Sequence, residues 1–316
     1  MQQLRDLRNE INATYRARSR SEALRDSVIR AVKEMPPMAV LPAEEKYAVG
    51  KRTLVLCLAD CHFGAEWTVR GLRGEVLNCY TPEVFCERMS ELLLQTRQIL
   101  EKEQIGDVQL LICGDSLDGM LRASQLMKLR WGVVESCMRF SEYMAQWINE
   151  LSRYATVSVC GVDGNHTETR SLNSKRGDFP GENLEKVIFW FLSERLKDNP
   201  GVVVDSETEQ QKHLSVQGYS ILLTHGTDVR MMEKAARQSM LLYSEGIDFF
   251  ICGHKHREQE CVSGYTDQGN AVIIRVPSIC GMDEYAQRLG YGGRPGALAM
   301  VLEAGYGRRC VYPINL

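Results

Sequence analysis

The feature that most constrains this chain is a series of five short polar motifs, each placed shortly after an apolar, strand-forming run. The runs cover residues 53–59, 108–113, 156–160, 219–223 and 248–252. The motifs are Asp60-Cys61-His62, Gly114-Asp115-Ser116-Leu117-Asp118, Gly164-Asn165-His166, Thr224-His225-Gly226 and Gly253-His254-Lys255-His256. Ligand-type side chains therefore recur at the ends of buried strands, where a rigid scaffold can hold two metal ions at a fixed separation.

The rest of the chain predicts an α/β fold. From residue 51 onward the strands alternate with amphipathic segments, and a β-rich ending follows residue 256. This alternation is typical of a layered α/β core. The chain has 316 residues, 44% of them hydrophobic, which is enough to bury a full core. The predicted helices cover residues 82–104, 121–154, 182–196 and 228–244, and the late strands cover 271–276, 298–303 and 309–312.

Residues 1–45 are predicted to form a separate helical arm, which leaves residues 46–316 as the main domain. Apolar residues recur at helical spacing in two short segments, and Pro36-Pro37 ends the second. Between residues 1 and 33, eight basic and four acidic side chains leave an excess of four positive charges. A solvated arm that packs on the domain or on a second subunit is favoured, and an arm that binds nucleic acid or a partner is the alternative.

Charge and hydropathy exclude some classes of protein. The formal net charge is −3, so no global basic field indicates nucleic-acid binding. Residues 1–30 are polar and Arg-rich, without the apolar core of a signal peptide. No apolar run approaches the roughly 20 residues of a membrane span. The expected location is therefore cytoplasmic, with no membrane contact.

The eleven cysteines do not form a recognisable metal or disulfide pattern. Their number is odd, and no Cys-x-x-Cys pair is present. Cys57, Cys113, Cys160 and Cys252 each lie in a predicted strand just before a motif. We expect these four to be small core residues, because unpaired cysteine is among the most buried residue types.

The motif side chains have the chemistry of metal ligands. Asp60 and His62 are two residues apart, so on an extended segment both point toward one ion. The carboxylate of Asp115 has two oxygens and can bridge two cations. Asn165 adds a carbonyl oxygen, and the imidazoles come from His225, His254 and His256.

Taken together and in this order, the motifs resemble the calcineurin-like metallophosphoesterase superfamily. That pattern is Asp-x-His, Gly-Asp-x-x-Asp, Gly-Asn-His, a single His and Gly-His-x-His, and every element is present here. The resemblance covers about residues 51–276. Residues 281–291 are also similar to phage- or prophage-borne members. The resemblance implies a metallophosphoesterase-type β-sandwich core flanked by helices in a four-layer αββα arrangement, with residues 46–316 as the catalytic domain.

The resemblance also implies a role for each motif residue. Asp60, His62 and His256 would hold one metal, Asn165, His225 and His254 would hold the other, and Asp115 would bridge the two. His166 would contact the phosphate or its leaving oxygen, and Asp118 would orient His166. In the implied mechanism a metal-bridging hydroxide attacks phosphorus. Because the donors are nitrogen and oxygen without thiolate, Mn²⁺ is favoured, with Fe, Zn²⁺ or Mg²⁺ as alternatives.

Two departures from the family pattern bear on the substrate. Ser/Thr phosphatases of the family place Arg after the second Asp of Gly-Asp-x-x-Asp, where this chain has Gly119. They also place a carboxylate or similar group after Gly-Asn-His, where this chain has Thr167. Loss of the Arg clamp favours a phosphodiesterase, nuclease-like or nucleotide-directed. The alternatives are a phosphomonoesterase acting on a small molecule or phosphoprotein and, less favoured, a non-catalytic scaffold. Expected partners are a phosphoester substrate, with nucleic acid or a nucleotide as candidates, and a second copy through the N-terminal arm.

Overall fold

The computed structural model describes the chain except for residues 1–25, 45, 120–122, 170–180, 227–245 and 291–292. The chain divides into two compact units, residues 1–39 and 40–316. Within the first unit, residues 26–33 are helical. The division predicted from the sequence lies after residue 45. Glu44 belongs to the second unit, where it pairs with Arg153 at 2.8 Å and Arg97 at 3.5 Å.

A six-stranded sheet provides the first half of the sandwich, in the order β13-β12-β1-β4-β5-β6. Strands β1, β4, β5 and β6 run parallel, and β12 and β13 extend the sheet in antiparallel fashion. Parallel strands that are covered on both faces show continuous apolar runs, as seen in β1. The bounds are β1 (Arg52–Leu58), β4 (Asp107–Ile112), β5 (Thr156–Gly161), β6 (Val202–Val204), β12 (Gly296–Glu303) and β13 (Gly307–Asn315).

A five-stranded sheet provides the second half, in the order β10-β11-β9-β8-β7. Its central strands β8, β9 and β11 are parallel to one another. Side chains from the facing sheets form one buried core that includes Val55, Leu111, Ile221 and Ile251. The bounds are β7 (Gln211–Val216), β8 (Tyr219–Thr224), β9 (Phe249–Cys252), β10 (Gln259–Thr266) and β11 (Gly269–Arg275).

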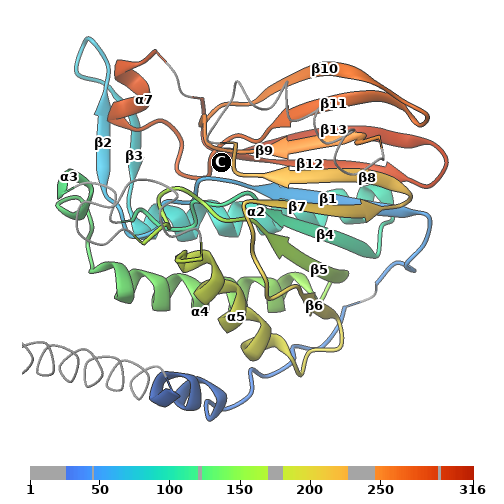
Figure 1. Cartoon of the computed structure of the whole chain (residues 1–316), viewed down its shortest axis with the longest axis horizontal. Coiled ribbons are helices and arrows are strands. Elements are labelled where there is room, and N and C mark those ends of the chain that lie inside the picture. The colour runs from blue at the N-terminus through green and yellow to red at the C-terminus, as the bar shows by residue number, and fades with distance from the viewer. Residues whose placement is uncertain (1–25, 45, 120–122, 170–180, 227–245, 291–292) are drawn as a thin grey trace, which may run out of the picture. The chain divides into compact units, whose positions relative to one another are not determined.

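Three helices cover the outer face of the six-stranded sheet (Figure 1). They are α2 (Pro82–Glu103), α4 (Val133–Leu151) and α5 (Leu184–Leu196). Helix α2 begins where the Thr81 side chain accepts a hydrogen bond from the Val84 amide, with proline at the first helical position. The predicted α/β sandwich flanked by helices is confirmed. The predicted helix at 228–244 lies outside the described residues.

A hairpin and a short helix project at one end of the sandwich, beside the ends of β1 and β9 (Figure 1). The hairpin consists of β2 (Trp67–Arg70) and β3 (Val76–Tyr80), and the helix is α7 (Glu284–Arg288). Neither was predicted, because each is too short to show a clear hydrophobic period.

The predicted helix at 121–154 is wrong in one respect, because the structure divides it into α3 (Ala123–Leu126) and α4. The backbone between them turns back to pair with the segment that follows β1. The Arg130 amide donates to the Gly64 carbonyl at 2.9 Å, and the Glu66 amide donates to the Lys128 carbonyl at 2.9 Å. These tertiary hydrogen bonds outweigh the local helical tendency.

Burial confirms the expected role of the strand cysteines. Cys57, Cys113 and Cys160 belong to the core between the sheets, and Cys252 belongs to a smaller cluster with Phe250. Among the described residues, no helix has both the length and the apolar composition that crossing a lipid bilayer requires.

Candidate metal centre

The five motifs meet at one edge of the sandwich, where the parallel strands of both sheets end. Asp60, Asp115 and Asn165 follow β1, β4 and β5, while His225 and His254 follow β8 and β9. Two sheets therefore contribute side chains to one site. This arrangement follows from the topology, because carboxyl ends of parallel strands lie at the same edge of a sheet.

The backbone at these turns is unusual. Asp60, His62, Asp115, His254 and His256 have φ angles of 50°, 45°, 54°, 70° and 50°, in the left-handed region. They are five of the seven non-glycine residues with positive φ in the described part of the chain. Such conformations cost on the order of 1 kcal/mol or more each and concentrate at functional sites. The surrounding structure therefore holds these side chains in directions that relaxed turns would not give.

One group of side chains surrounds His62. Its Nε2 lies 3.2 Å from Nε2 of His256, 3.9 Å from Oδ1 of Asp60 and 3.9 Å from Oδ2 of Asp115. Nε2 of His256 lies 3.7 Å from the same Asp60 oxygen. The structure thus brings together the three residues assigned by the resemblance to one ion, with Asp115 at their side.

A second group surrounds His225. Its Nε2 lies 2.8 Å from Oδ1 of Asn165, 3.2 Å from Nδ1 of His254 and 3.1 Å from Oδ2 of Asp115. Nδ1 of His225 donates to the Cys113 carbonyl at 2.8 Å, so Nε2 is the nitrogen that can face a metal ion. The same oxygen of Asp115 lies beside both groups, as a bridging carboxylate requires.

The side chains of the first group are arranged to contact a cation placed among them rather than to contact one another. Asp60 is fully buried, and its Oδ1 has no hydrogen-bond partner among the described residues. Nδ1 of His256 lies 3.2 Å from the Gly281 carbonyl, to which it can donate, so its Nε2 faces Nε2 of His62 as an acceptor. Buried carboxylates and facing imidazole nitrogens are satisfied together by a positive ion placed among them.

The electrostatics of the site follow from these buried carboxylates. Burial alone lowers the pKa of His225, but the charge of Asp115 outweighs it and raises that pKa to about 9. Burial also lowers the pKa of His62, but the hydrogen bond to Asp118 and the charge of Asp115 raise it to about 9. Burial and the neighbouring His225 lower the pKa of His254 to about 2. The field of the site therefore favours positive charge next to Asp115.

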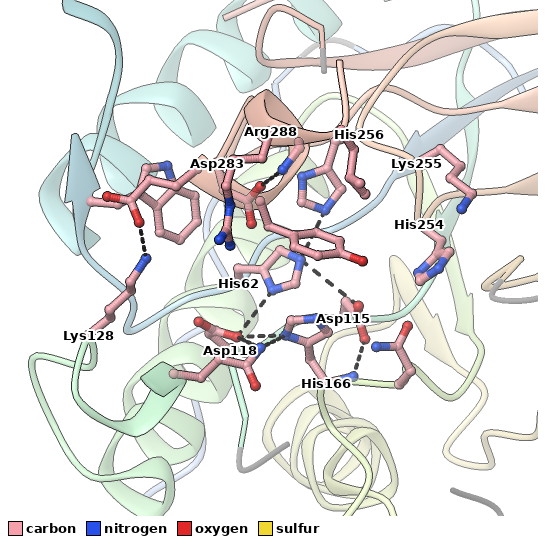
Figure 2. Close-up of a pocket in the computed structure, with 17 residues that line it drawn as sticks. His62, Asp115, Asp118, Lys128, His166, His254, Lys255, His256, Asp283 and Arg288 are labelled. Atoms are coloured by element: carbon pink, nitrogen blue, oxygen red, sulfur yellow. Dashed lines mark hydrogen bonds and ion pairs between the residues drawn. The ribbon is translucent and has the colours of Figure 1, made fainter. Parts of the chain in front are cut away.

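His166 lies beside Asp118 and below His62 in Figure 2. Its Nδ1 lies 2.6 Å from Oδ1 of Asp118, and its backbone amide donates to Oδ1 of Asp115 at 2.7 Å. Burial raises the pKa of Asp118, but its hydrogen bonds with His166 and His62 hold that pKa below the usual range. Gln125, which the sequence did not single out, lies 3.0 Å from the same nitrogen of His166.

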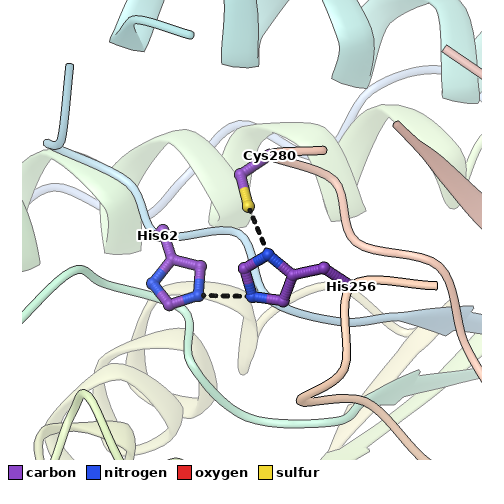
Figure 3. Close-up of side chains that lie close together, drawn as sticks. All are labelled: His62, His256 and Cys280. Carbon is purple, nitrogen blue, oxygen red and sulfur yellow. Dashed lines mark hydrogen bonds between the residues drawn. The ribbon is translucent and has the colours of Figure 1, made fainter. Parts of the chain in front are cut away.

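A cysteine also lies next to the first group (Figure 3). Sγ of Cys280 is 3.8 Å from Nδ1 of His256, and its thiol donates to the Gly281 carbonyl at 3.4 Å. Burial raises the pKa of Cys280 well above its usual value, so the sulfur is a neutral thiol. The predicted donor set contained no sulfur. Cys280 lies on the Nδ1 side of His256, away from the nitrogen that faces His62.

The start of α5 fixes two of the ligand-bearing turns. The carboxylate of Glu185 accepts hydrogen bonds from the Ser116 amide at 2.9 Å and the Ser116 hydroxyl at 2.7 Å. The Asn183 side chain caps the helix and donates to the Gly164 carbonyl at 2.9 Å. A Cβ at Gly164 would approach the Asp115 amide nitrogen to 2.2 Å, which explains the glycine there. Sequence reasoning missed Glu185, although a carboxylate in the first turn of an apolar helix is a visible signal.

Both groups open onto a cavity of about 450 Å³. This volume lies in the range of small-molecule sites. One side of the cavity is formed by predicted ligands together with Asp118 and His166, and the other by α7 and its neighbours. The cavity therefore gives a substrate of moderate size access to the candidate metal centre.

Comparison with known proteins agrees with this geometry. A family model for calcineurin-like phosphoesterases matches residues 53–258, a range that includes every predicted ligand. The SPbeta prophage-derived uncharacterized protein YonJ of Bacillus subtilis (strain 168) is 29% identical over 314 residues, which cover 98% of this chain and 76% of that protein. The predicted likeness to prophage-borne proteins is thereby confirmed.

Solved structures that match this chain at low sequence identity include three proteins. A dimetal phosphatase from Danio rerio matches with a TM-score of 0.40 and 11% identity, covering 83% of this chain and 98% of that chain. Vacuolar Protein Sorting 29 from Cryptosporidium parvum matches with a TM-score of 0.39 and 11% identity, covering 84% of this chain and 100% of that chain. An archaeal phosphodiesterase matches with a TM-score of 0.38 and 11% identity, covering 83% of this chain and 99% of that chain.

The buried carboxyl group of Glu185 predicts a pH-dependent stability. Burial raises its pKa from 4.5 to about 7. Because the folded-state pKa is raised, the stabilising contribution is complete at low pH and is lost as the pH rises through about 7. In metal-free protein, the unfolding free energy of the wild type should fall relative to that of Glu185→Gln between about pH 5 and about pH 8. Because one pKa unit corresponds to about 1.4 kcal/mol, the unfolding free energies of the two proteins should diverge by up to about 3 kcal/mol.

Urea unfolding at several pH values measures this difference. Glu135→Gln, which alters a glutamate that is 51% exposed on α4, is the matched control and should follow the wild type. Parallel pH profiles for the wild type and Glu185→Gln would contradict the prediction.

Proposed function

We propose that this chain, which belongs to the calcineurin-like phosphoesterase family, is a metal-dependent phosphodiesterase with two metal ions. One observation carries the proposal. Oδ2 of Asp115 lies 3.1 Å from a ring nitrogen of His225 and 3.9 Å from a ring nitrogen of His62, so one carboxylate serves two groups of ligand-type side chains. A non-catalytic scaffold would not need such an arrangement of strained, buried ligands.

In the proposed site, Asp60, His62 and His256 hold one ion, while Asn165, His225 and His254 hold the other. When bound, such a pair of ions supplies a nucleophile at neutral pH and neutralises charge on the phosphoryl oxygens. The nitrogen and oxygen donors favour Mn²⁺, with Fe, Zn²⁺ or Mg²⁺ as alternatives.

His166 is proposed as the general acid. Its Nδ1 faces Asp118 at 2.6 Å, so Nε2 is the nitrogen that remains for the substrate. The carboxylate of Asp118 accepts a hydrogen bond from Nδ1 and so fixes the orientation and the tautomer of the ring. A protonated Nε2 can donate its proton to the leaving oxygen, and Asp118 keeps the ring in place as the charge changes.

The preference for a diester rests on the backbone around Gly119. A Cβ at this position would lie 1.6 Å from the carbonyl oxygen of His166. No side chain fits there, so the arginine that clamps a phosphate dianion in Ser/Thr phosphatases has no room. Thr167 is fully buried, so it does not present a polar group to the cavity either. A phosphodiester carries one negative charge fewer on the phosphate and depends less on such a clamp.

The direct test of the proposed preference compares two chromogenic substrates in the presence of Mn²⁺. We expect kcat/KM for bis-p-nitrophenyl phosphate to exceed that for p-nitrophenyl phosphate, because the site lacks the dianion clamp. A clear preference for the monoester would instead favour the alternative function, a phosphomonoesterase acting on a small molecule or phosphoprotein.

The shared carboxylate predicts the number of bound ions. Metal analysis of the loaded wild-type protein should find two ions per chain. Asp115→Asn should bind fewer, because an amide provides one neutral acceptor oxygen in place of a charged pair. Asp205→Asn, at a carboxylate that is 49% exposed on the surface, should retain both ions. A single ion in fully active wild-type protein would be inconsistent with the proposal.

Replacing the proposed acid should separate chemistry from metal binding. His166→Ala should keep both ions but lose about 10²–10⁴-fold in kcat, the usual contribution of general acid catalysis. His213→Ala is the matched control, since this histidine belongs to none of the five motifs and is exposed on β7, where it is hydrogen-bonded to Ser220. If His166→Ala emptied a metal site, His166 would be a ligand instead.

A further inference from the structure

The side of the cavity opposite the ligand turns is a wall built by α7 and the β2–β3 hairpin. The loop that leads into α7 is tied to the hairpin: the Met282 carbonyl accepts from the Trp67 indole at 3.2 Å and from the Asn78 amide at 2.7 Å. The Gln287 side chain donates to the Arg70 carbonyl at 2.8 Å. We refer to residues 283–289 together with Trp67 as the α7 wall. These hydrogen bonds connect the wall to the hairpin.

The α7 wall presents an aromatic ring and a cation to the cavity. Tyr285 and Arg288 both line it, together with His62, Asp115 and His166. Tyr285 is 52% exposed, although it belongs to a cavity wall. Figure 2 shows Arg288 on the same side of the cavity as Asp283, above His62. Both side chains line the cavity, and neither is a predicted metal ligand.

Acidic side chains on the same wall are already engaged. Oδ1 of Asp283 accepts a hydrogen bond from the Ala286 amide at 2.6 Å and so caps α7. Glu284 pairs with Lys128 at 2.7 Å. These contacts limit the repulsion that the wall would exert on an anion. The guanidinium carbon of Arg288 lies 6.0 Å from the Tyr285 ring centroid, at the outer limit of a cation–π contact.

We infer that the α7 wall is a nucleotide subsite, in which Tyr285 stacks on a nucleobase and Arg288 binds a phosphate next to the one that is hydrolysed. An aromatic platform beside a guanidinium is the combination that binds bases and backbone together in single-stranded nucleic acids and nucleotides. The inference deepens the proposed function, on which it rests, by naming a nucleotide-containing phosphodiester as the substrate class.

The subsite can be tested by equilibrium binding, which does not require turnover. Titration calorimetry on the Mn²⁺-loaded protein should show that thymidylate binds about tenfold more tightly than inorganic phosphate, in line with the contribution of one stacked base. Tyr285→Leu should remove most of that advantage, and Tyr285→Trp should keep it, because the ring rather than the hydroxyl is used.

The turn between β12 and β13 offers a matched control. Tyr306 is 70% exposed, and the guanidinium carbon of Arg309 lies 5.5 Å from its ring centroid. The two residue types are again three positions apart in the sequence, but neither lines the cavity. Tyr306→Leu should leave the preference for thymidylate unchanged. Equal affinities for thymidylate and phosphate, or an advantage that survives in Tyr285→Leu, would overturn the nucleobase assignment.

A ligand that carries a second phosphate group tests the proposed role of Arg288. A thymidine bisphosphate should bind the wild type more tightly than thymidylate, and Arg288→Gln should abolish the difference, whereas Arg309→Gln should keep it. A difference that persists in Arg288→Gln would overturn the phosphate assignment. If thymidylate binds as expected but no phosphodiester is hydrolysed, the subsite stands and the proposed catalytic function fails, so the two failures are distinguishable.

Discussion

The burial of one carboxylate, Asp115, is the constraint on which the rest of the site depends. This side chain is 1% exposed and lies beside ring nitrogens from strands of both sheets. An isolated buried carboxylate is strongly unfavourable, so its neighbours must supply positive charge. Burial raises the pKa of Asp115, but the charges of His225 and His166 hold it well below its usual range. The ionised carboxylate in turn favours cations beside it, as the raised pKa of His225 shows.

Holding that carboxylate in place requires the strained turns and the contacts that support them. Five of the predicted ligands occupy left-handed backbone conformations that their side chains do not favour. The start of α5 braces two of the ligand-bearing turns, the strained one at Asp115 through Glu185 and the one at Gly164 through Asn183. A helix of the outer layer therefore helps to hold the ligand turns, although it contributes no ligand. The strain is tolerable because the sandwich around it buries an extensive apolar core.

Much of this arrangement could be predicted from the sequence, and the exceptions share one cause. The strands that precede the ligands were found because buried parallel strands are continuously apolar, and α2 was found from its proline and periodicity. The interruption between α3 and α4 depends on hydrogen bonds to Gly64 and Glu66, distant in sequence. The positions of Gln125 and Cys280 beside the site depend in the same way on tertiary contacts that leave no local pattern.

The close approach of position 119 to the His166 carbonyl has an evolutionary consequence. A chain with this backbone cannot acquire the arginine of the Ser/Thr phosphatases through a single codon change, because any Cβ would collide with the main chain. The loop after Asp118 and the turn that carries His166 would have to move apart first, and that turn also carries Asn165. Introducing an arginine at position 119 therefore requires coordinated substitutions in both segments rather than a single exchange.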